Sequence, residues 1–405
     1  MKKKYESTLI IIALWLLMFA SSSQFFIMPP ILPQICSQLK VEENLLGILI
    51  SAYSFSLGIM ALFAGYLSDK IGRRNILLIG STLMTIFLFA HILAYNFYSI
   101  LTIRILTGVA GGILTGSCIS FVRDYYPYNK RGWANGVIVS GSGIGQIVGI
   151  PVGVILGESY GFATPFQIFG LVMLFALISI YFFIPRTITT IERVKIKPLL
   201  IIRGYINLLK KSTFRSLSII YILMYFSITI FLVYYPKWIA LAFNAKARDI
   251  ALIFFIGGIA SLVASPIAGK YSDLFGRKKV IIITNISLAL TMLFGVFAKT
   301  SLIESSVLFF FAMLFISGRL VSIQSHASDI TNLKNRGQVM CLMISVGQIG
   351  MGLGSGIAGF LFSEIGFEMN LIVGAAICVL LTFIIFKHTP FNLEYLIMFK
   401  NSNQR

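Results

Sequence analysis

Twelve long apolar segments leave this chain few ways to fold. Each contains about 20 mostly apolar residues, the length that an α-helix needs to cross the hydrocarbon core of a membrane. None shows the apolar–polar alternation of barrel strands. The sequence therefore predicts an all-α membrane protein with twelve transmembrane helices. The segments are residues 8–30, 44–66, 75–94, 99–122, 133–157, 165–185, 214–236, 249–269, 280–298, 305–327, 338–362 and 370–387.

The composition agrees with this prediction and argues against other classes of protein. Of the 405 residues, 57% are hydrophobic and only 12% are charged, whereas about 25% of residues are charged in soluble domains. The four cysteines lie far apart, so the sequence predicts neither a disulfide framework nor a metal site. The apolar start, preceded by three lysines, also fits a cleaved signal peptide. Its removal would leave eleven spans, so we interpret it as the first transmembrane helix.

The positive charge of the chain predicts its orientation. The formal net charge is +19, and basic residues collect in the loops on the cytoplasmic side of membrane proteins. If both termini lie in the cytoplasm, the inner segments hold 26 of the 33 Lys and Arg, and the outer loops hold five. The charge thus indicates a multi-pass protein of the cytoplasmic (inner) membrane that contacts anionic lipid headgroups, and not a nucleic-acid partner.

The two halves of the sequence repeat each other. Residues 65–74 (GYLSDKIGRR) return 204 positions later as residues 269–278 (GKYSDLFGRK). Matches also recur at a shift of 205, such as Asp124 with Asp329, Gly145 with Gly350, and Gly161 with Gly366. This register predicts two pseudo-symmetric six-helix bundles. We expect an N-terminal bundle over residues 1–185, a basic cytoplasmic linker over 186–213, and a C-terminal bundle with a short cytoplasmic tail over 214–405.

The repeated loop resembles a signature of the major facilitator superfamily of secondary transporters. It has the pattern G-x-L-x-D-x-x-G-R-R, and the stretch from Arg104 to Gly112 is similar to the R-x-x-x-G-x-G stretch of that family. The Gly- and Pro-containing fifth segment resembles the drug and sugar efflux branch. Since Pro151 follows Ile150 and not a glycine, the resemblance is closer to the arabinose-efflux-like proton antiporters. Together the resemblance covers nearly the whole chain.

The resemblance implies a conformational latch at the cytoplasmic side. Glycines let neighbouring backbones turn or approach closely, and an arginine can form a bidentate pair with a carboxylate. The family suggests that Arg73 pairs with an acid at the inner end of the fourth helix, here Asp124, and that the second copy pairs Arg277 with Asp329. The alternative is that the basic residues of the loop only follow the positive-inside rule. The expected latch residues are Gly65, Asp69, Gly72, Arg73, Asp124, Asp273, Arg277 and Asp329.

In the superfamily a central cavity is lined by helices 1, 4, 7 and 10, so the polar and aromatic residues at mid-depth of these helices are candidate substrate contacts. Two glutamines on neighbouring turns of helices 5 and 11 also reach inward in this interpretation. Each of these residues also fits a simple hydrogen bond between helices. The expected cavity residues are Gln24, Phe25, Arg104, Thr115, Gln146, Tyr221, Tyr225, Arg319 and Gln348.

Charged residues inside the spans narrow the class of substrate. All fourteen acids fall in loops or at the ends of spans, while Arg104 and Arg319 lie within them. A buried arginine is costly in a membrane and needs a cavity or a partner. Arg319 is expected to face backbone carbonyls, water or an anionic group of the substrate. A carboxylate-poor cavity that contains arginines favours a neutral or anionic solute over a cation.

Proton coupling, which the resemblance implies, has several candidate carriers. They are Glu158, Asp249 and His326, with Asp124 as a further one, and the sequence does not choose among them. Histidine titrates near neutral pH, but His91 and His326 both lie close to span ends, where we expect solvated boundary histidines. The fifth and eleventh segments each carry a row of glycines, which includes Gly143 in the fifth and Gly350 in the eleventh. We interpret these rows as close-packing surfaces.

The function predicted from these features is secondary active transport by alternating access, with proton-coupled efflux of a small neutral or anionic organic compound. The alternatives are an uptake symporter or uniporter for a sugar or organic anion, and a transport-inactive receptor or scaffold. No nucleotide-binding or catalytic motif occurs in the sequence, so no enzyme and no cofactor are expected. The expected partners are the solute, protons and membrane lipids, and the family resemblance implies a monomer.

Overall fold

The computed structural model describes residues 2–185, 198–297, 301–331 and 336–388. Within these ranges the regular secondary structure is helical. Twelve segments are long and apolar enough to cross a membrane. The predicted class, an all-α membrane protein with twelve spans, is therefore confirmed.

The first six spans are built from α1 to α8 with three short irregular turns. Their bounds are α1 Lys2–Phe26, α2 Met28–Leu39, η1 Glu43–Leu45, α3 Leu46–Ile71, α4 Arg73–Phe89, η2 Ala90–Leu93, α5 Phe97–Tyr125, α6 Tyr128–Ile144, η3 Gly145–Gly149, α7 Ile150–Tyr160 and α8 Ala163–Phe183. We call α1 to α8 the N-terminal set.

The last six spans are built from α10 to α16, which we call the C-terminal set. A separate amphipathic helix, α9, precedes them. The bounds are α9 Pro198–Lys210, α10 Ser212–Leu232, α11 Tyr235–Phe243, α12 Ala247–Phe275, α13 Arg277–Gly295, α14 Leu302–Asp329, α15 Arg336–Glu364 and α16 Phe367–His388.

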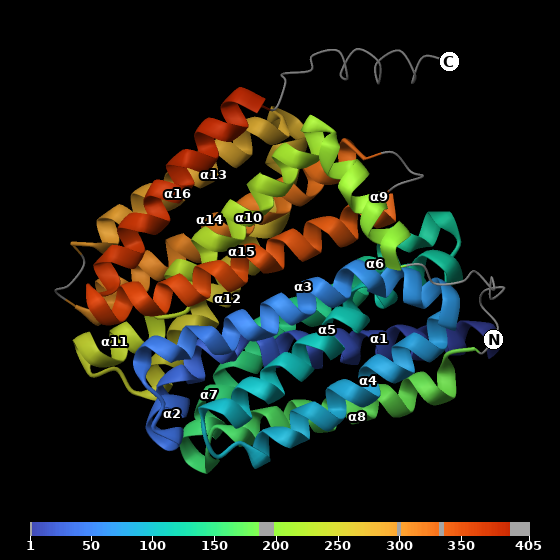
Figure 1. The fold of residues 1–405 in the computed structure, drawn as a ribbon, viewed down its shortest axis with the longest axis horizontal. Helices are drawn as coiled ribbons and strands as arrows, with labels where there is room; N and C mark the ends of the chain where they lie inside the picture. The colour runs from blue at the N-terminus through green and yellow to red at the C-terminus, as the bar shows by residue number, and fades with distance from the viewer. Residues whose placement is uncertain (1, 186–197, 298–300, 332–335, 389–405) are drawn as a thin grey trace.

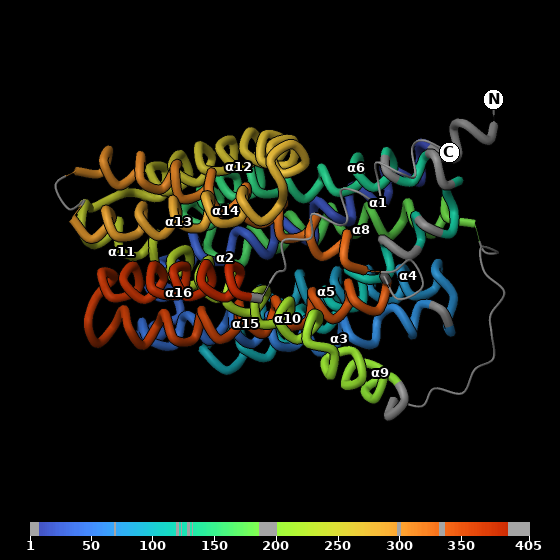
Figure 2. The backbone as a smooth tube through the Cα atoms, turned by 90° about the horizontal axis from the view of Figure 1, so that it is seen from above, coloured from blue at the N-terminus to red at the C-terminus, as the bar shows by residue number. Residues whose placement is uncertain are grey.

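The two sets lie side by side (Figures 1 and 2). In Figure 1 the N-terminal set, blue to green, fills the lower half, and the C-terminal set, yellow-green to red, fills the upper half. The predicted pair of six-helix bundles is thus present. The helix α9 falls within the expected linker, but residues 186–197 and 389–405 lie outside the described residues. The exact domain boundaries and the cytoplasmic tail therefore stay predictions.

Three spans are interrupted, each near a proline. The first breaks at Ile27, before Pro29 and Pro30, and the seventh breaks before Pro236. Proline is favoured in the first turn of a helix because it has no N–H to leave unpaired there. In the fifth span Pro151 cannot donate to the carbonyl four residues earlier, and the preceding turn, η3, is a π-helix.

The repeat of the sequence is also present in the backbone. The described residues with a left-handed φ are Lys40, Gly72, Gly161, Asn244, Gly276 and Gly366. They form three pairs separated by 204 or 205 residues. At Gly72 and Gly276, with φ of 95° and 93°, one helix ends and the next begins. Since side chains are strained at this φ, each loop requires its glycine.

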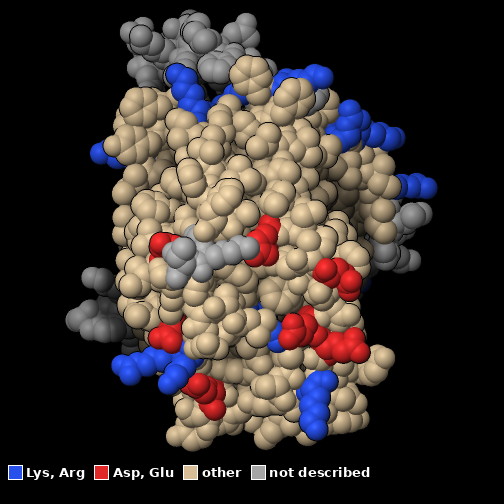
Figure 3. Space-filling view, turned by 90° about the vertical axis from the view of Figure 1, so that its left-hand side faces the viewer, with Lys and Arg blue, Asp and Glu red and all other residues tan. Residues whose placement is uncertain are grey.

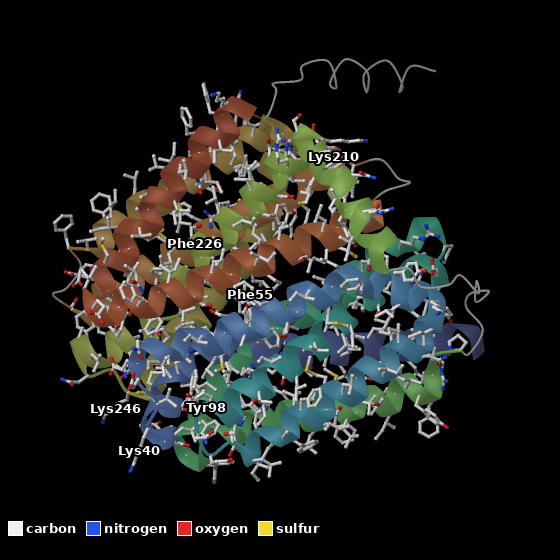
Figure 4. The ribbon with its side chains drawn as sticks, in the orientation of Figure 1. Lys40, Phe55, Tyr98, Lys210, Phe226 and Lys246 are labelled. Atoms are coloured by element: carbon white, nitrogen blue, oxygen red, sulfur yellow. The ribbon has the colours of Figure 1, made fainter. Side chains whose placement is uncertain are left out.

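The two sets meet along three helix pairs, α3 with α15, α7 with α12, and α2 with α11. We call the end of the molecule with α2 and α11 the α11 end, and the opposite end, which carries α9, the α9 end. In Figure 4, Lys40 and Lys246 lie at the α11 end, Lys210 lies at the α9 end, and Phe55 and Phe226 lie between the two ends. The α3–α15 contact runs the length of both helices, since Gly352 adjoins Phe55 and Gly65 adjoins Cys341.

The outer surface of the helices is apolar between the two ends. Large side chains such as Ile59, Phe175 and Phe383 are each about 60% exposed, as expected for groups that face lipid. Acidic side chains gather at the α11 end, which faces the viewer in Figure 3. The described basic residues of the repeated loops and of α9 lie at the α9 end.

Candidate functional site

Arg104 is buried inside the N-terminal set, on α5. It is 1% exposed, so it faces neither lipid nor bulk water. Its guanidinium carbon lies 4.5 Å from the ring centroid of Phe166 on α8 and 5.8 Å from that of Tyr53 on α3. Such cation–π contacts stabilise a buried cation. Among the described residues, no carboxylate is bonded to Arg104.

The hydrogen bonds of Arg104 go to two neutral side chains. Nη2 lies 2.9 Å from Nε2 of His91, and Nη1 donates to Oε1 of Gln24 at 3.4 Å. The expectation that His91 is a solvated boundary histidine is wrong: its exposed fraction is 0%, and its ring stacks on Phe166 with centroids 4.0 Å apart. The reason is that His91 lies in the short helix η2, where its side chain is buried against Phe166 while those of Ile92 and Leu93 are exposed.

Gln24 connects Arg104 to the boundary between the two sets. Its amide donates to the hydroxyl of Tyr53 and to the carbonyl of Ser21, both at 3.0 Å. The Tyr53 ring lies 5.3 Å from that of Phe25. Tyr53, Phe25 and Ile344 of α15 belong to one apolar cluster. These contacts connect the buried arginine to the apolar cluster at the boundary with the C-terminal set.

Arg319 occupies a separate polar network inside the C-terminal set. It is 0% exposed. Its guanidinium donates to Oδ1 of Asn285 at 2.7 Å, to Oγ of Ser227 at 3.0 Å and to the carbonyl of Met224 at 3.2 Å. Of the partners that the sequence left open, the structure supplies a backbone carbonyl and neutral side chains. A contact between Arg319 and substrate stays a prediction.

The other expected cavity residues lie on the helices that meet between the sets. Tyr221 and Tyr225 on α10 have ring centroids 6.3 Å apart and adjoin Gly347 of α15. Gln348, one residue on, has a buried Oε1 without a hydrogen-bond partner among the described residues. Thr115 bonds within its own helix, to the carbonyl of Gly111.

Gln146 lies in the π-helical turn η3 and is half-buried. This turn packs against α1 and α12, one helix from each set. Gln146 is therefore near the boundary between the sets, and substrate contact there stays a prediction.

The two predicted arginine–aspartate pairs are present, one in each set. Nε of Arg73 lies 2.7 Å from Oδ2 of Asp124. Arg277 is bonded to both oxygens of Asp329, and its Nη1 lies 3.0 Å from Oδ1 of Asp273. Each pair ties together helices of the same set. Whether they act as a latch stays a prediction.

The other latch residues fall around these pairs. Gly65 lies on α3 near Cys341 of α15, and Gly72 forms the left-handed corner between α3 and α4. The side chain of Asp69 lies outside the described part of the chain, so its role in the latch stays a prediction.

The three proton-carrier candidates lie far from one another. Glu158 is exposed at the end of α7. Asp249 accepts a hydrogen bond from the backbone N–H of Lys246 at 2.9 Å and lines a groove of about 370 Å³ between α12 and α14. The lining side chains Leu252 and Ile303 are exposed apolar groups, so the groove faces lipid. His326, near the α9 end of α14, lies beside Lys278 at a small cavity of about 10 Å³.

A group of polar contacts that was not predicted from the sequence joins the two sets at the α11 end. Nζ of Lys237 lies 2.7 Å from Oε1 of Glu43 and 3.4 Å from Sγ of Cys36. The Tyr234 hydroxyl donates to the carbonyl of Glu43 at 2.7 Å and accepts from the N–H of Gly47 at 2.9 Å. The available signal was Lys237 in the C-terminal half and Glu43 in a loop of the N-terminal half. One sequence does not show that two residues about 190 positions apart are paired.

Comparison with known proteins shows which family the chain resembles. The model of the Major Facilitator Superfamily matches residues 14–214 and 217–397. Multidrug resistance protein MdtG of Proteus mirabilis is 29% identical over 280 residues, which cover 67% of this chain and 68% of that protein. The same-named protein of Salmonella arizonae is 28% identical over 296 residues, covering 71% and 72%.

Solved structures share the fold at low sequence identity. A D-xylose–proton symporter superposes with a TM-score of 0.77 at 17% identity, covering 95% of this chain and 98% of that one. The human organic anion transporter MFSD10 gives a TM-score of 0.72 at 16% identity, with 93% and 98% covered.

Proposed function

The chain belongs to the major facilitator superfamily, and from this premise we propose that it is a secondary transporter that exports a small neutral or anionic organic compound in exchange for protons. The name of its relatives in Proteus mirabilis and Salmonella arizonae, multidrug resistance protein, supports export. The proposed location is the inner membrane, with both termini in the cytoplasm and lipids around a monomer.

The observation that carries the proposed substrate class is the bonding of Arg104. Its guanidinium is buried and is bonded to the neutral groups of His91 and Gln24. A charge in a low-dielectric interior attracts an opposite charge much more strongly than it does in water. A solute with an anionic or strongly hydrogen-bonding acceptor group would therefore gain from contact with Arg104, and a cation would be repelled.

The proposed orientation in the membrane is supported by the charge distribution. Because basic loops remain in the cytoplasm, the α9 end is the proposed cytoplasmic face. The polar contacts of Tyr234 and Lys237 then close the outside. In this proposal the structure represents a state closed to the outside, in which both arginine–aspartate pairs are already formed, each within one set.

A solute screen in inside-out membrane vesicles tests the proposal. We expect a subset of neutral or anionic compounds to be accumulated when the vesicle interior is acidic, with proton efflux evoked by the solute. Arg104→Gln should abolish this flux. The matched control is Arg74→Gln, because Arg74 bonds the carbonyl of Tyr181 at the α9 end and does not contact Arg104.

The same assay separates the alternatives. Solute movement that ignores the pH gradient would indicate a uniporter. Solute and protons that move in the same direction would indicate a symporter. Either result would contradict proton-coupled export.

A further inference from the structure

His91 is buried against the one arginine that carries the proposed function. It lies in η2, and its ring and the guanidinium of Arg104 share the face of Phe166, at 4.0 Å and 4.5 Å from its centroid. Both residues are at most 1% exposed. The imidazole is therefore held in one place by an aromatic ring and by a cation.

The hydrogen bonds fix which ring nitrogen of His91 carries the proton. A guanidinium can only donate hydrogen bonds. Nε2, which lies 2.9 Å from Nη2 of Arg104, must therefore be an acceptor with a free lone pair. Nδ1 lies 2.8 Å from the carbonyl of Phe87 and 3.2 Å from that of Leu88, which are both acceptors. The ring is thus the neutral tautomer with its proton on Nδ1.

The other groups around this pair bring no negative charge. On α1, Gln24 accepts from Arg104, and on α3 the ring of Tyr53 lies 5.8 Å from the guanidinium. On α8 the neighbour is Phe166, and on α4 it is backbone carbonyl. Among the described residues, no Asp or Glu is bonded to His91 or Arg104. A proton on Nε2 would therefore meet the N–H groups of a cation with no anion to offset it.

We propose that His91 is the proton-binding group of this transporter and that Arg104 controls when it binds. While Arg104 donates to Nε2, His91 stays neutral. When Arg104 moves away from His91 while no solute is bound, the lone pair of Nε2 is released and takes up one proton from water on the outside. Nδ1 keeps its proton and its bond to Phe87. When a solute from the cytoplasm binds other N–H groups of Arg104 and Arg104 returns to Nε2, that proton leaves to cytoplasmic water. Solute and proton are thus bound in turn.

The position of the pair suits proton entry from outside. Arg104 is seven residues into α5, which corresponds to about 10 Å from its start at the α11 end. This inference rests on the proposed proton coupling and deepens it, since it assigns the carrier that the sequence left open. His91 also replaces Glu158, Asp249 and His326 as the proposed proton carrier. None of these three contacts Arg104.

Nitrogen-15 NMR of histidine-labelled protein in lipid nanodiscs tests this assignment without a transported solute. The chain has three histidines, and His91→Asn identifies the signals of His91. In the wild type we expect the neutral Nδ1–H pattern of His91 to persist from pH 8 to pH 5. In Arg104→Gln we expect conversion to imidazolium across that range. Arg104→Lys, which keeps a cation, should remain neutral.

Two results would overturn the proposal. One is a wild-type His91 that titrates like a solvated histidine, and the other is an Arg104→Gln protein whose His91 stays neutral to pH 5. Arg74→Gln serves as the matched arginine control and should leave the His91 signals unchanged. Since the Arg104→Lys variant reports on the same contact, a misfolded Arg104→Gln protein would not end the test. A failed solute screen combined with the expected NMR result would refute export but not the proton site.

Discussion

At the scale of residues, the two arginine–aspartate pairs have the same sequence origin but different surroundings. The exposed side-chain fractions are 3% and 20% for Arg73 and Asp124, against 25% and 54% for Arg277 and Asp329. Solvent weakens the attraction within an exposed ion pair, whereas loss of a partner costs more where the remaining charge is buried. Arg277 also keeps a second partner, Asp273.

These differences predict unequal effects of the same substitution. Asp124→Asn should lower the free energy of unfolding by about 2 kcal/mol, whereas Asp329→Asn should lower it by less than about 1 kcal/mol. Thermal unfolding of the purified variants measures both values under the same conditions. Equal drops in the unfolding midpoint would show that burial does not distinguish the pairs.

At the residue level, the sequence predicted contacts whose two partners the family resemblance indicates. It did not predict contacts whose partners are brought together only by the fold. Arg73 and Asp124 could be paired because the family resemblance suggested an acid at the inner end of the fourth helix. The bond between His91 and Arg104 could not be foreseen, because it depends on which side chain of η2 is buried between the helices. The partners of Arg319 come from three helices, α10, α13 and α16, and no local pattern brings these together.

At the scale of elements, the glycine rows have unequal roles. A Cβ at Gly350 would lie within 2.8 Å of the backbone of Ile222 on α10, whereas a Cβ at Gly143 would have no neighbour within 4 Å. Gly350 therefore allows α15 to approach α10, and Gly143 lies on an open face of α6.

This contrast predicts that Gly350→Ala destabilises the protein by about 1–3 kcal/mol, the usual range for overpacking. Gly143→Ala should be neutral or slightly stabilising, because alanine has the higher helix propensity. Unfolding followed by fluorescence-detected size exclusion compares the two variants. A Gly350→Ala protein as stable as Gly143→Ala would contradict close packing at this crossing.

The helix α9 is tied to the N-terminal set by one buried phenol. Tyr205 donates to the carbonyl of Leu62 on α3 at 2.9 Å, and burial raises the pKa of Tyr205. A raised pKa means that the docked helix favours the neutral phenol. Docking should therefore be independent of pH below about pH 10, the ordinary tyrosine value, and weaken above it.

A fluorophore on Lys210→Cys, in a background without the native cysteines, measures the docking of α9. We expect its mobility to rise above about pH 10 in the parent protein. In Tyr205→Phe the mobility should be somewhat higher at pH 7, because one hydrogen bond of about 1 kcal/mol is lost, and this rise with pH should disappear. An identical pH response in Tyr205→Phe would show that another group controls α9.

Elements were the best-predicted level of the fold. All twelve spans follow from length and hydropathy, because every segment that crosses lipid must be apolar and helical. The breaks of the first and seventh spans were not predicted, although Pro29, Pro30 and Pro236 mark them. Proline allows a helix either to restart or to bend, and only packing with neighbouring helices decides which.

At the scale of the whole molecule, polar contacts between the two sets gather at the α11 end. Lys237 is 8% exposed and joins Glu43 and Cys36 across the boundary. Opening of this end in an alternating-access cycle would require these bonds to break. The native thiol of Cys36 is therefore a reporter of opening.

We expect Lys237→Gln to make Cys36 react about three- to fivefold faster with a membrane-impermeant maleimide, which corresponds to the loss of an ion pair worth up to about 1 kcal/mol. The reversed pair Glu43→Lys with Lys237→Glu should restore the slow rate. Lys246→Gln, at the same end but outside this contact, is the control. Faster labelling in the reversed pair as well would mean that packing, and not charge, keeps this end closed.

The three pairs of left-handed residues carry a consequence for the origin of the chain. Lys40, Gly72 and Gly161 each have a counterpart with a left-handed φ 204 or 205 residues later. Three such matches are not expected to arise independently in the two halves. A duplicated ancestral gene explains such matched corners directly. The side chains between them have since diverged, which left a buried guanidinium at unlike depths in the two copies, Arg104 in one and Arg319 in the other. The two halves thus share the backbone of their ancestor, and the different positions of their buried arginines arose after the duplication.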